Sequence, residues 1–154
     1  MLVLHNIRSI HNVGSIFRTA DAAGVSKIIL SGYTPTPLDR FGRARSDLAK
    51  VALGAEKTIP WESAATLMPV LKRLKKEGFT LLAIEQSPKA TPLFEWHPPS
   101  PSQPIALVLG NEVRGLSSQA LQAADAILEI PMRGKKESLN VSVAAGIALF
   151  AVMK

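Results

Sequence analysis

Short, uninterrupted apolar runs constrain the fold of this chain most, because they recur at intervals that leave room for a helix between them. Such runs stay apolar at successive positions instead of alternating with polar residues. This is typical of strands buried on both faces of a parallel sheet. The sequence therefore predicts an α/β domain of three layers, with a mostly parallel sheet between helices. The predicted strands are Met1–Leu4, Lys27–Leu30, Thr80–Ile84, Ile105–Leu109 and Ala126–Ile130.

The stretches between these runs carry helical patterns. Asn12 is expected to cap the first helix, which Gly24 ends, and Asn140 is expected to cap the last. Residues 34–45 and 88–104 are rich in proline and are expected to be loops, the second a long crossover within one domain. The expected helices span Asn12–Ala23, Glu62–Lys76, Ser117–Ala124 and Val141–Met153.

Length and composition favour one basic domain. With 154 residues, the chain is expected to form a single domain over 1–154. Hydrophobic residues make up 47% and charged residues 19%, so part of the apolar surface is expected to lie between subunits. A net charge of +6 points to a polyanion such as RNA or DNA, although it serves solubility equally well.

Composition also excludes several kinds of site. The chain has no cysteine, which excludes disulfides and cysteine-based zinc sites. The three histidines lack a metal-ligand spacing, so no metal is expected. The N-terminus does not resemble a signal peptide, and the apolar stretch after Asn140 is too short to span a bilayer. We therefore expect a soluble cytoplasmic protein.

Three polar, glycine-bearing junctions each follow an apolar run: residues 11–20, 109–116 and 130–142. In the first, Gly14 would let backbone approach an anion at the helix start, and Arg18 could bind a phosphate. The second begins with Gly110 at the end of a strand, where ligands bind in open α/β sheets. Taken singly, each junction also fits a cap, a turn or a solvated loop. Together they suggest one composite site.

In this order, N-x-G-x-x-x-R-T-A, L-G-N-E-x-x-G-L, and I-P-M with S-L-N-V-S resemble the three motifs of the SpoU (TrmH-like) family of RNA ribose 2′-O-methyltransferases, in the SPOUT superfamily. The resemblance extends from Asn6 to the C-terminus. It implies an α/β fold with a C-terminal trefoil knot that holds S-adenosylmethionine as the methyl donor. It also implies a homodimer, with RNA crossing both subunits.

The resemblance also assigns roles to individual residues. The polar active-site positions of the family match Arg18, Asn12, Glu112, Ser138 and Asn140. The residues expected around the methyl donor are Ile84, Glu85, Gly110, Ile130, Met132 and Leu139. Since the chain looks like a bare catalytic core, RNA recognition is left to its own basic residues, which are Arg8, Arg40, Arg43, Arg45, Arg114, Lys135 and Lys136.

Within the family, Arg18 is the usual candidate for activating the ribose hydroxyl. Arginine stays protonated at any ordinary pH, so stabilising the developing oxyanion suits it better than acting as a general base.

Several functions remain open at this stage. A compact core without an added domain favours transfer RNA as the substrate, and ribosomal RNA is the alternative. A non-catalytic RNA-binding or assembly protein of the same fold is a second class, and it would bind RNA without turning over the methyl donor. Methylation of a base or small molecule ranks lower, since it usually accompanies different motifs. A dehydrogenase would need the glycine fingerprint that this sequence lacks.

Overall fold

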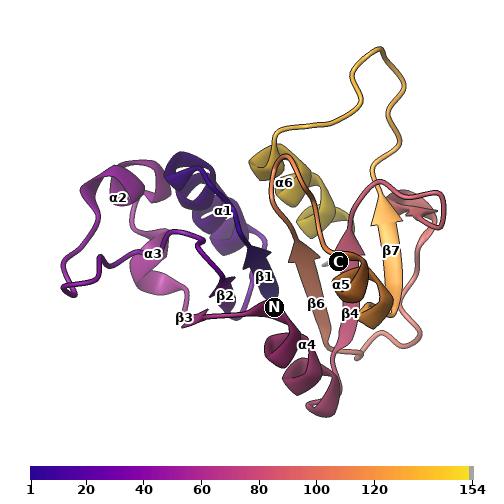
Figure 1. Ribbon diagram of the computed structural model, residues 1–154, viewed down its shortest axis with the longest axis horizontal. Coiled ribbons are helices and arrows are strands. Elements are labelled where there is room, and N and C mark those ends of the chain that lie inside the picture. Colours follow the sequence, from indigo (N-terminus) through magenta and orange to yellow (C-terminus); the bar gives the residue numbers. More distant parts are fainter. Residues whose placement is uncertain (153–154) are drawn as a thin grey trace.

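The computed structural model describes residues 1–152, and its centre is a sheet of seven strands. The strand order is β3-β2-β1-β6-β4-β7-β5, and every neighbouring pair is parallel (Figure 1). This confirms the predicted α/β class. The strands are β1 (Leu2–His5), β2 (Ile28–Ser31), β3 (Trp61–Ala64), β4 (Thr80–Ile84), β5 (Thr91–Pro92), β6 (Ile105–Leu109) and β7 (Ala126–Glu129).

All five predicted strands are present, to within one residue at each end. The two strands that the sequence did not reveal, β3 and β5, lie at the two edges of the sheet. An edge strand is less buried, so it needs no continuous apolar run; β3 reads Trp-Glu-Ser-Ala and is largely half-buried. Strand β5 has two residues, one of them Pro92, which a sheet tolerates at its edge.

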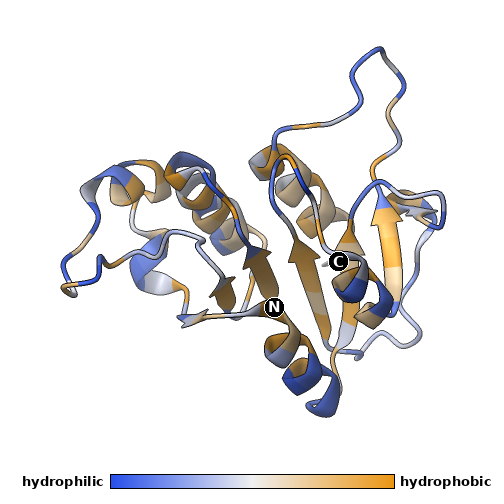
Figure 2. Ribbon diagram, in the orientation of Figure 1, coloured by the Kyte–Doolittle hydropathy of each residue, from blue (hydrophilic) through white to orange (hydrophobic). Residues whose placement is uncertain are grey.

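Helices cover both faces of the sheet, as the three-layer prediction required. Successive strand residues point to opposite faces: Leu2 and Leu4 of β1 pack against one group of helices, and Val3 packs against the other. Figure 2 shows the central strands between them as hydrophobic. One face is covered by α1 (Ile10–Ala22), α2 (Ser46–Ala52), α3 (Ala55–Thr58) and α6 (Val141–Val152), and the other by α4 (Leu67–Lys76) and α5 (Ser118–Ala123).

Two predicted helix starts are wrong. Helix α1 begins at Ile10, and its cap is Ser9, whose hydroxyl accepts a hydrogen bond from the Asn12 backbone N–H across 3.2 Å. Helix α4 begins at Leu67, because the preceding segment pairs with β2 as strand β3. In β3, Glu62 forms salt bridges with Lys27 and Arg73, which lower the pKa of its carboxyl group.

Ser117 caps α5, and Asn140 caps α6 as predicted. Ser117 accepts a hydrogen bond from the Ala120 N–H across 3.2 Å, and the Asn140 side chain accepts one from the Ser142 N–H across 2.9 Å. Met153, the predicted end of the last helix, lies outside the described residues.

The two predicted loops contain short ordered pieces. Residues 34–45 include a small hairpin closed by an antiparallel bridge between Leu38 and Ala44. Residues 88–104 connect the adjacent strands β4 and β6 and include β5 and the 3₁₀ helix η1 (Leu93–Glu95). The crossover prediction is confirmed, with Leu93 buried in the core. Within residues 1–152, no helix is long and apolar enough to cross a membrane.

Candidate active site

A cavity lies at the carboxyl ends of β4, β6 and β7, where ligands bind in open α/β sheets. Its lining comes from the ends of these strands, the loop after β7 and the first turns of α6. All six residues predicted to surround the methyl donor line this cavity. The lining residues are Ile84, Glu85, Gln86, Leu109, Gly110, Asn111, Glu112, Glu129, Ile130, Met132, Ser138, Leu139, Val141 and Ala144.

Glycines shape the turn that follows β6. A side chain at Gly110 would lie 2.6 Å from the Gly115 backbone carbon, so the turn closes only because Gly110 has none. Gly115 has a φ of +64°, which favours glycine, and a side chain there would meet the Glu85 carboxylate. Glu85 accepts a hydrogen bond from the Leu116 N–H across 2.9 Å. The turn is therefore packed tightly against Glu85 at the end of β4.

Asn111 is a site residue to which sequence reasoning gave no role. It is buried, and its side-chain oxygen accepts hydrogen bonds from the N–H groups of Val113 and Arg114. Its amide donates to the Asn6 carbonyl and to the Tyr33 hydroxyl, each across 2.9 Å. Its position between Gly110 and Glu112 was the available signal, since asparagine side chains commonly bond the backbone of a turn.

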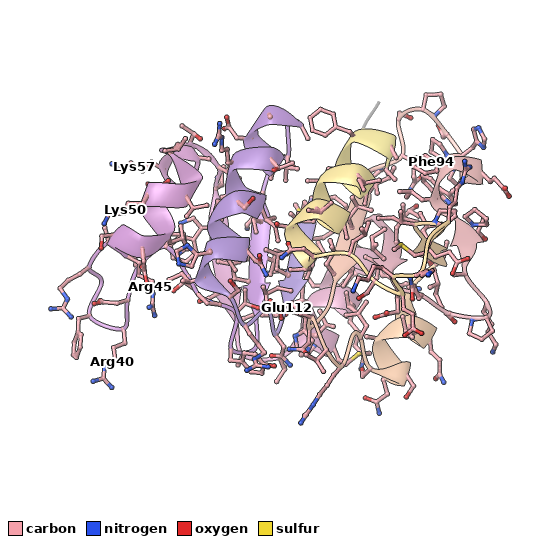
Figure 3. All side chains as sticks on the ribbon, turned by 90° about the horizontal axis from the view of Figure 1, so that it is seen from above. Arg40, Arg45, Lys50, Lys57, Phe94 and Glu112 are labelled. Atoms are coloured by element: carbon pink, nitrogen blue, oxygen red, sulfur yellow. The ribbon has the colours of Figure 1, made fainter. Side chains whose placement is uncertain are left out.

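Glu112 lies in a groove that adjoins the cavity, near the middle of the view in Figure 3. Its carboxylate accepts hydrogen bonds from the backbone N–H groups of Arg8 and Ser9, at 3.0 and 3.3 Å, and from the Asn12 amide at 3.4 Å. Burial alone would raise the pKa of Glu112, but these hydrogen bonds together hold that pKa below its usual range. Glu112 is therefore a carboxylate at neutral pH.

The same groove joins all three junctions of the sequence. The Asn140 amide donates to the Asn12 side-chain oxygen across 3.1 Å, and Asn12 in turn donates to Glu112. Ser138 and Leu139 line both the groove and the cavity, so the two are continuous. The structure thus brings together four of the five predicted catalytic residues: Asn12, Glu112, Ser138 and Asn140.

The fifth, Arg18, lies elsewhere. It is exposed on α1 and lines neither the cavity nor the groove. It follows Asn12 by six residues, which places it about 9 Å further along the helix and roughly 120° around its axis. Within one chain, Arg18 therefore does not face the groove that holds Asn12.

Gly14 has a different role from the predicted one. It is buried, and a side chain there would lie 2.9 Å from the Leu48 carbonyl oxygen and 3.0 Å from the Val51 Cβ. Gly14 therefore permits close packing of α1 on α2, and it does not serve the approach of an anion.

The residues predicted to bind RNA are spread over the surface. Arg8 lines the groove, and Arg114, Lys135 and Lys136 are exposed on the loops around it. Arg40, Arg43 and Arg45 lie together on the hairpin before α2. Among residues 1–152, no group of three or more histidines and carboxylates is arranged to hold a metal ion.

Comparison with known proteins agrees with this architecture. The chain is 34% identical over 154 residues to the 23S rRNA (guanosine-2'-O-)-methyltransferase RlmB of Ralstonia nicotianae, an alignment that covers 100% of this chain and 58% of the relative. It is 34% identical over 149 residues to the RlmB of Neisseria meningitidis, covering 97% of this chain and 56% of the relative. The chain thus spans little more than half the length of these relatives.

Solved structures give the same result. An AdoMet-bound rRNA methyltransferase from Sinorhizobium meliloti superposes with a TM-score of 0.86 and 31% identity, over 97% of this chain and 54% of that one. The TrmH/SpoU tRNA modifying enzyme of A. aeolicus superposes with a TM-score of 0.83 and 29% identity, over 99% of this chain and 73% of that one. The sequence model of the SpoU rRNA Methylase family matches residues 1–150. This chain belongs to the SpoU rRNA methylase family.

Proposed function

We propose that residues 1–154 form a single catalytic domain that transfers a methyl group from S-adenosylmethionine to a ribose 2′-hydroxyl of RNA. The observation that carries this proposal is the continuity of two sites: a cavity lined by apolar residues and carboxylates, and a polar groove beside it. Such a pair can hold a donor and an acceptor next to one another. The trefoil knot stays a prediction from the family resemblance.

The cavity suits S-adenosylmethionine in its chemistry. Leu109, Ile130 and Leu139 offer apolar surface for a flat purine, while Glu85 and Glu129 offer negative charge to a ligand that is cationic at its sulfonium and amino groups. When bound, the donor supplies an activated methyl group that needs neither a metal nor a covalent intermediate. The residues proposed to hold it are Ile84, Glu85, Gly110, Ile130, Met132 and Leu139.

The groove residues would then orient the acceptor. Asn12 and Asn140 are linked by a hydrogen bond, and Glu112 fixes Asn12 and the backbone at Arg8. This network can position a ribose within reach of the neighbouring cavity and exclude water from it. Ser138 adds a hydroxyl at the boundary of the two. Orientation of the ribose, rather than proton abstraction by a buried base, is the role that we assign to these four residues.

Arg18 needs a second subunit to take part. Helix α6, which packs beside α1, exposes Val143 (49%) and Phe150 (58%), seven residues apart on one face. We propose that this face forms a homodimer interface. Arg18 is exposed on the adjoining helix, so the dimer would bring it to the partner's groove. There it would stabilise the developing 2′-oxyanion and the neighbouring phosphate.

We favour ribosomal RNA as the substrate. The sequence alone favoured transfer RNA, but similar relatives carry names that specify 23S rRNA. The net charge of +6 suits either RNA. We expect the protein to act in the cytoplasm.

Calorimetry with S-adenosylmethionine and its demethylated product tests the proposal on metal-free protein. The account predicts that both ligands bind. A Gly110→Ala variant should lose binding, because the turn that lines the cavity cannot close around a side chain. The absence of binding by the wild-type protein would instead support the alternative, an RNA-binding or assembly protein of the same fold.

A further inference from the structure

The hairpin of residues 37–45 presents an aromatic ring to solvent. Phe41 is 66% exposed, although burying its side chain would be favourable. The guanidinium carbons of Arg40 and Arg43 lie 4.7 and 5.0 Å from the centre of its ring. The ring is therefore largely open to solvent, with two cations beside it at the surface.

A single carboxylate holds this ring outward. One oxygen of Asp39 accepts hydrogen bonds from the Phe41 and Arg43 N–H groups, at 2.8 and 2.9 Å, and the other accepts from the Arg43 guanidinium at 2.9 Å. The bond from the Arg43 backbone N–H is the main cause that lowers the pKa of Asp39. Backbone hydrogen bonds between residues 39 and 43 and between residues 37 and 45 close the hairpin. Phe41 is therefore exposed on an ordered hairpin that these hydrogen bonds hold together, and not on an unstructured loop.

Positive charge continues from the hairpin along the neighbouring helices. Figure 3 shows Arg40, Arg45, Lys50 and Lys57 following one edge of the molecule, from the hairpin past α2 to α3. Lys50 and Lys57 are both exposed. A row of cations with an aromatic ring at one end matches a nucleic-acid strand, because the phosphates meet the cations and one base can meet the ring.

We infer that Phe41 is a stacking platform for one unpaired nucleobase of the RNA substrate, and that Arg40 and Arg43, which lie over the ring in the free protein, move to the phosphates on either side when the base stacks. This inference rests on the proposed function, and it adds that the recognised segment is single-stranded. In a duplex, both faces of each base are already covered by neighbouring bases, so none is free to stack on a protein side chain. The platform therefore selects a loop, bulge or end.

The first test uses an RNA hairpin that carries 2-aminopurine in its single-stranded loop, and a fully paired duplex of matching composition. Stacking on Phe41 should quench the fluorescence of 2-aminopurine when the wild-type protein binds. Phe41→Ala should abolish this quenching and weaken binding of the hairpin about 5- to 150-fold, the usual range for one base on one aromatic ring. Affinity for the duplex should change little.

Phe94→Ala is the matched control, because Phe94 is also 66% exposed and lies on the opposite side of the molecule (Figure 3). It should bind both RNAs like the wild-type protein. Phe41→Tyr should keep the quenching, because it keeps an aromatic face.

Asp39→Ala separates stacking from simple charge attraction. This change removes a negative charge from the basic surface, so a purely electrostatic surface would bind RNA more tightly. Since the change also removes the hydrogen bonds that hold Phe41 outward, the inference predicts weaker binding of the loop RNA and less quenching.

Tighter binding by Asp39→Ala would overturn the inference. The inference would also fail if Phe41→Ala bound the RNA hairpin as tightly as the wild-type protein, or if it lost the same affinity for the RNA hairpin and the RNA duplex. It would fail too if the wild-type protein did not bind the RNA hairpin. Calorimetry with S-adenosylmethionine on the same samples tests the proposed function separately. If the donor binds but Phe41 has no effect, only this inference fails. If Phe41 stacks on the base but the donor does not bind, only the methyltransferase proposal fails.

Discussion

The side-chain amide of Asn140 donates a hydrogen bond to the side-chain oxygen of Asn12 across 3.1 Å, although the two residues are 128 positions apart in the chain. Through Asn12 the contact extends to Glu112. The three junctions of the sequence are therefore linked by two successive side-chain hydrogen bonds, beside the cavity proposed for the methyl donor.

If this pair orients the acceptor as a unit, its two members should not act independently. We expect Asn12→Ala and Asn140→Ala each to slow methyl transfer roughly 10- to 100-fold, because a misplaced acceptor reacts poorly. The double variant should lose little more than either single variant. Single-turnover rates measure this, with Gln119→Ala, an exposed amide on α5, as the control. Losses that multiply in the double variant would mean that the two amides act separately.

His5 should make the stability of the protein depend on pH. The side-chain nitrogen of Asn6 lies 3.1 Å from Nε2 of His5, and because this nitrogen can only donate, Nε2 must accept. The proton of the neutral ring is therefore on Nδ1, which lies 2.9 Å from the Ser31 hydroxyl. Burial lowers the pKa of His5 in the folded protein. As the pH falls, the histidine therefore gains its second proton, which makes the ring a cation, in the unfolded chain before it does so in the folded protein. Stability is therefore full above the unfolded value of about 6.5 and decreases as the pH falls toward the lower folded pKa.

The measurement is the melting temperature between neutral pH and about pH 5. His5→Gln should flatten this dependence, because glutamine can accept from Asn6 and donate to Ser31 without titrating in this range. Equal slopes for the wild-type and variant proteins would show that another group is responsible.

Gly14→Ala should destabilise the protein without touching the site. The added carbon would lie 2.9 Å from the Leu48 carbonyl oxygen and would force α1 away from α2, at a cost of roughly 1 to 3 kcal/mol. Gly134→Ala is the matched control, because a side chain there would meet nothing within 4 Å. Denaturant unfolding compares the two. A Gly14→Ala variant as stable as Gly134→Ala would contradict the packing role.

Arg18→Ala should abolish methyl transfer and leave stability and donor binding nearly unchanged, since Arg18 is exposed and lines no part of the donor cavity. Loss of a group aimed at a developing oxyanion costs on the order of a hundred- to a thousand-fold in rate. Arg18→Lys should restore little, because an ammonium cannot reproduce the planar fork.

Mixing two impaired variants tests where Arg18 acts. If Arg18 serves the partner's groove, a dimer of one Arg18→Ala subunit and one Asn140→Ala subunit contains one intact site. Random mixing should then restore about a quarter of wild-type activity, since half of the dimers are mixed and each has one working site of two. No recovery would place Arg18 in the site of its own subunit, and light scattering that shows a monomer would refute the dimer itself.

The sequence predicted the centre of the fold better than its edges. The central strands β2, β1, β6 and β4 are largely buried on both faces, so each leaves a continuous apolar run. The edge strand β3 leaves none, and its Glu62 was placed in a helix.

The same contrast holds for the site. Gly110, Glu112 and Asn140 lie in motifs that mark the ends of elements, so their meeting could be predicted from the order of the junctions. The direction of Arg18 could not, because it depends on where α1 begins, and its cap is Ser9 and not Asn12. Gly14 was misread for a related reason. A glycine inside a helix serves ligand approach or helix packing equally well until the neighbouring helix is known.

The central claim is that this chain methylates a ribose 2′-hydroxyl of RNA, and one transfer experiment tests it directly. Purified protein is incubated with S-adenosylmethionine labelled in its methyl group and with ribosomal RNA from cells that lack the protein. The product is digested to nucleosides and its methylated positions are mapped. The account predicts label in a 2′-O-methylated nucleoside at a defined position of the RNA, appearing roughly 10- to 100-fold more slowly with the Asn12→Ala, Asn140→Ala double variant. Label on a base, or no label in any RNA under conditions in which the donor binds, would contradict it.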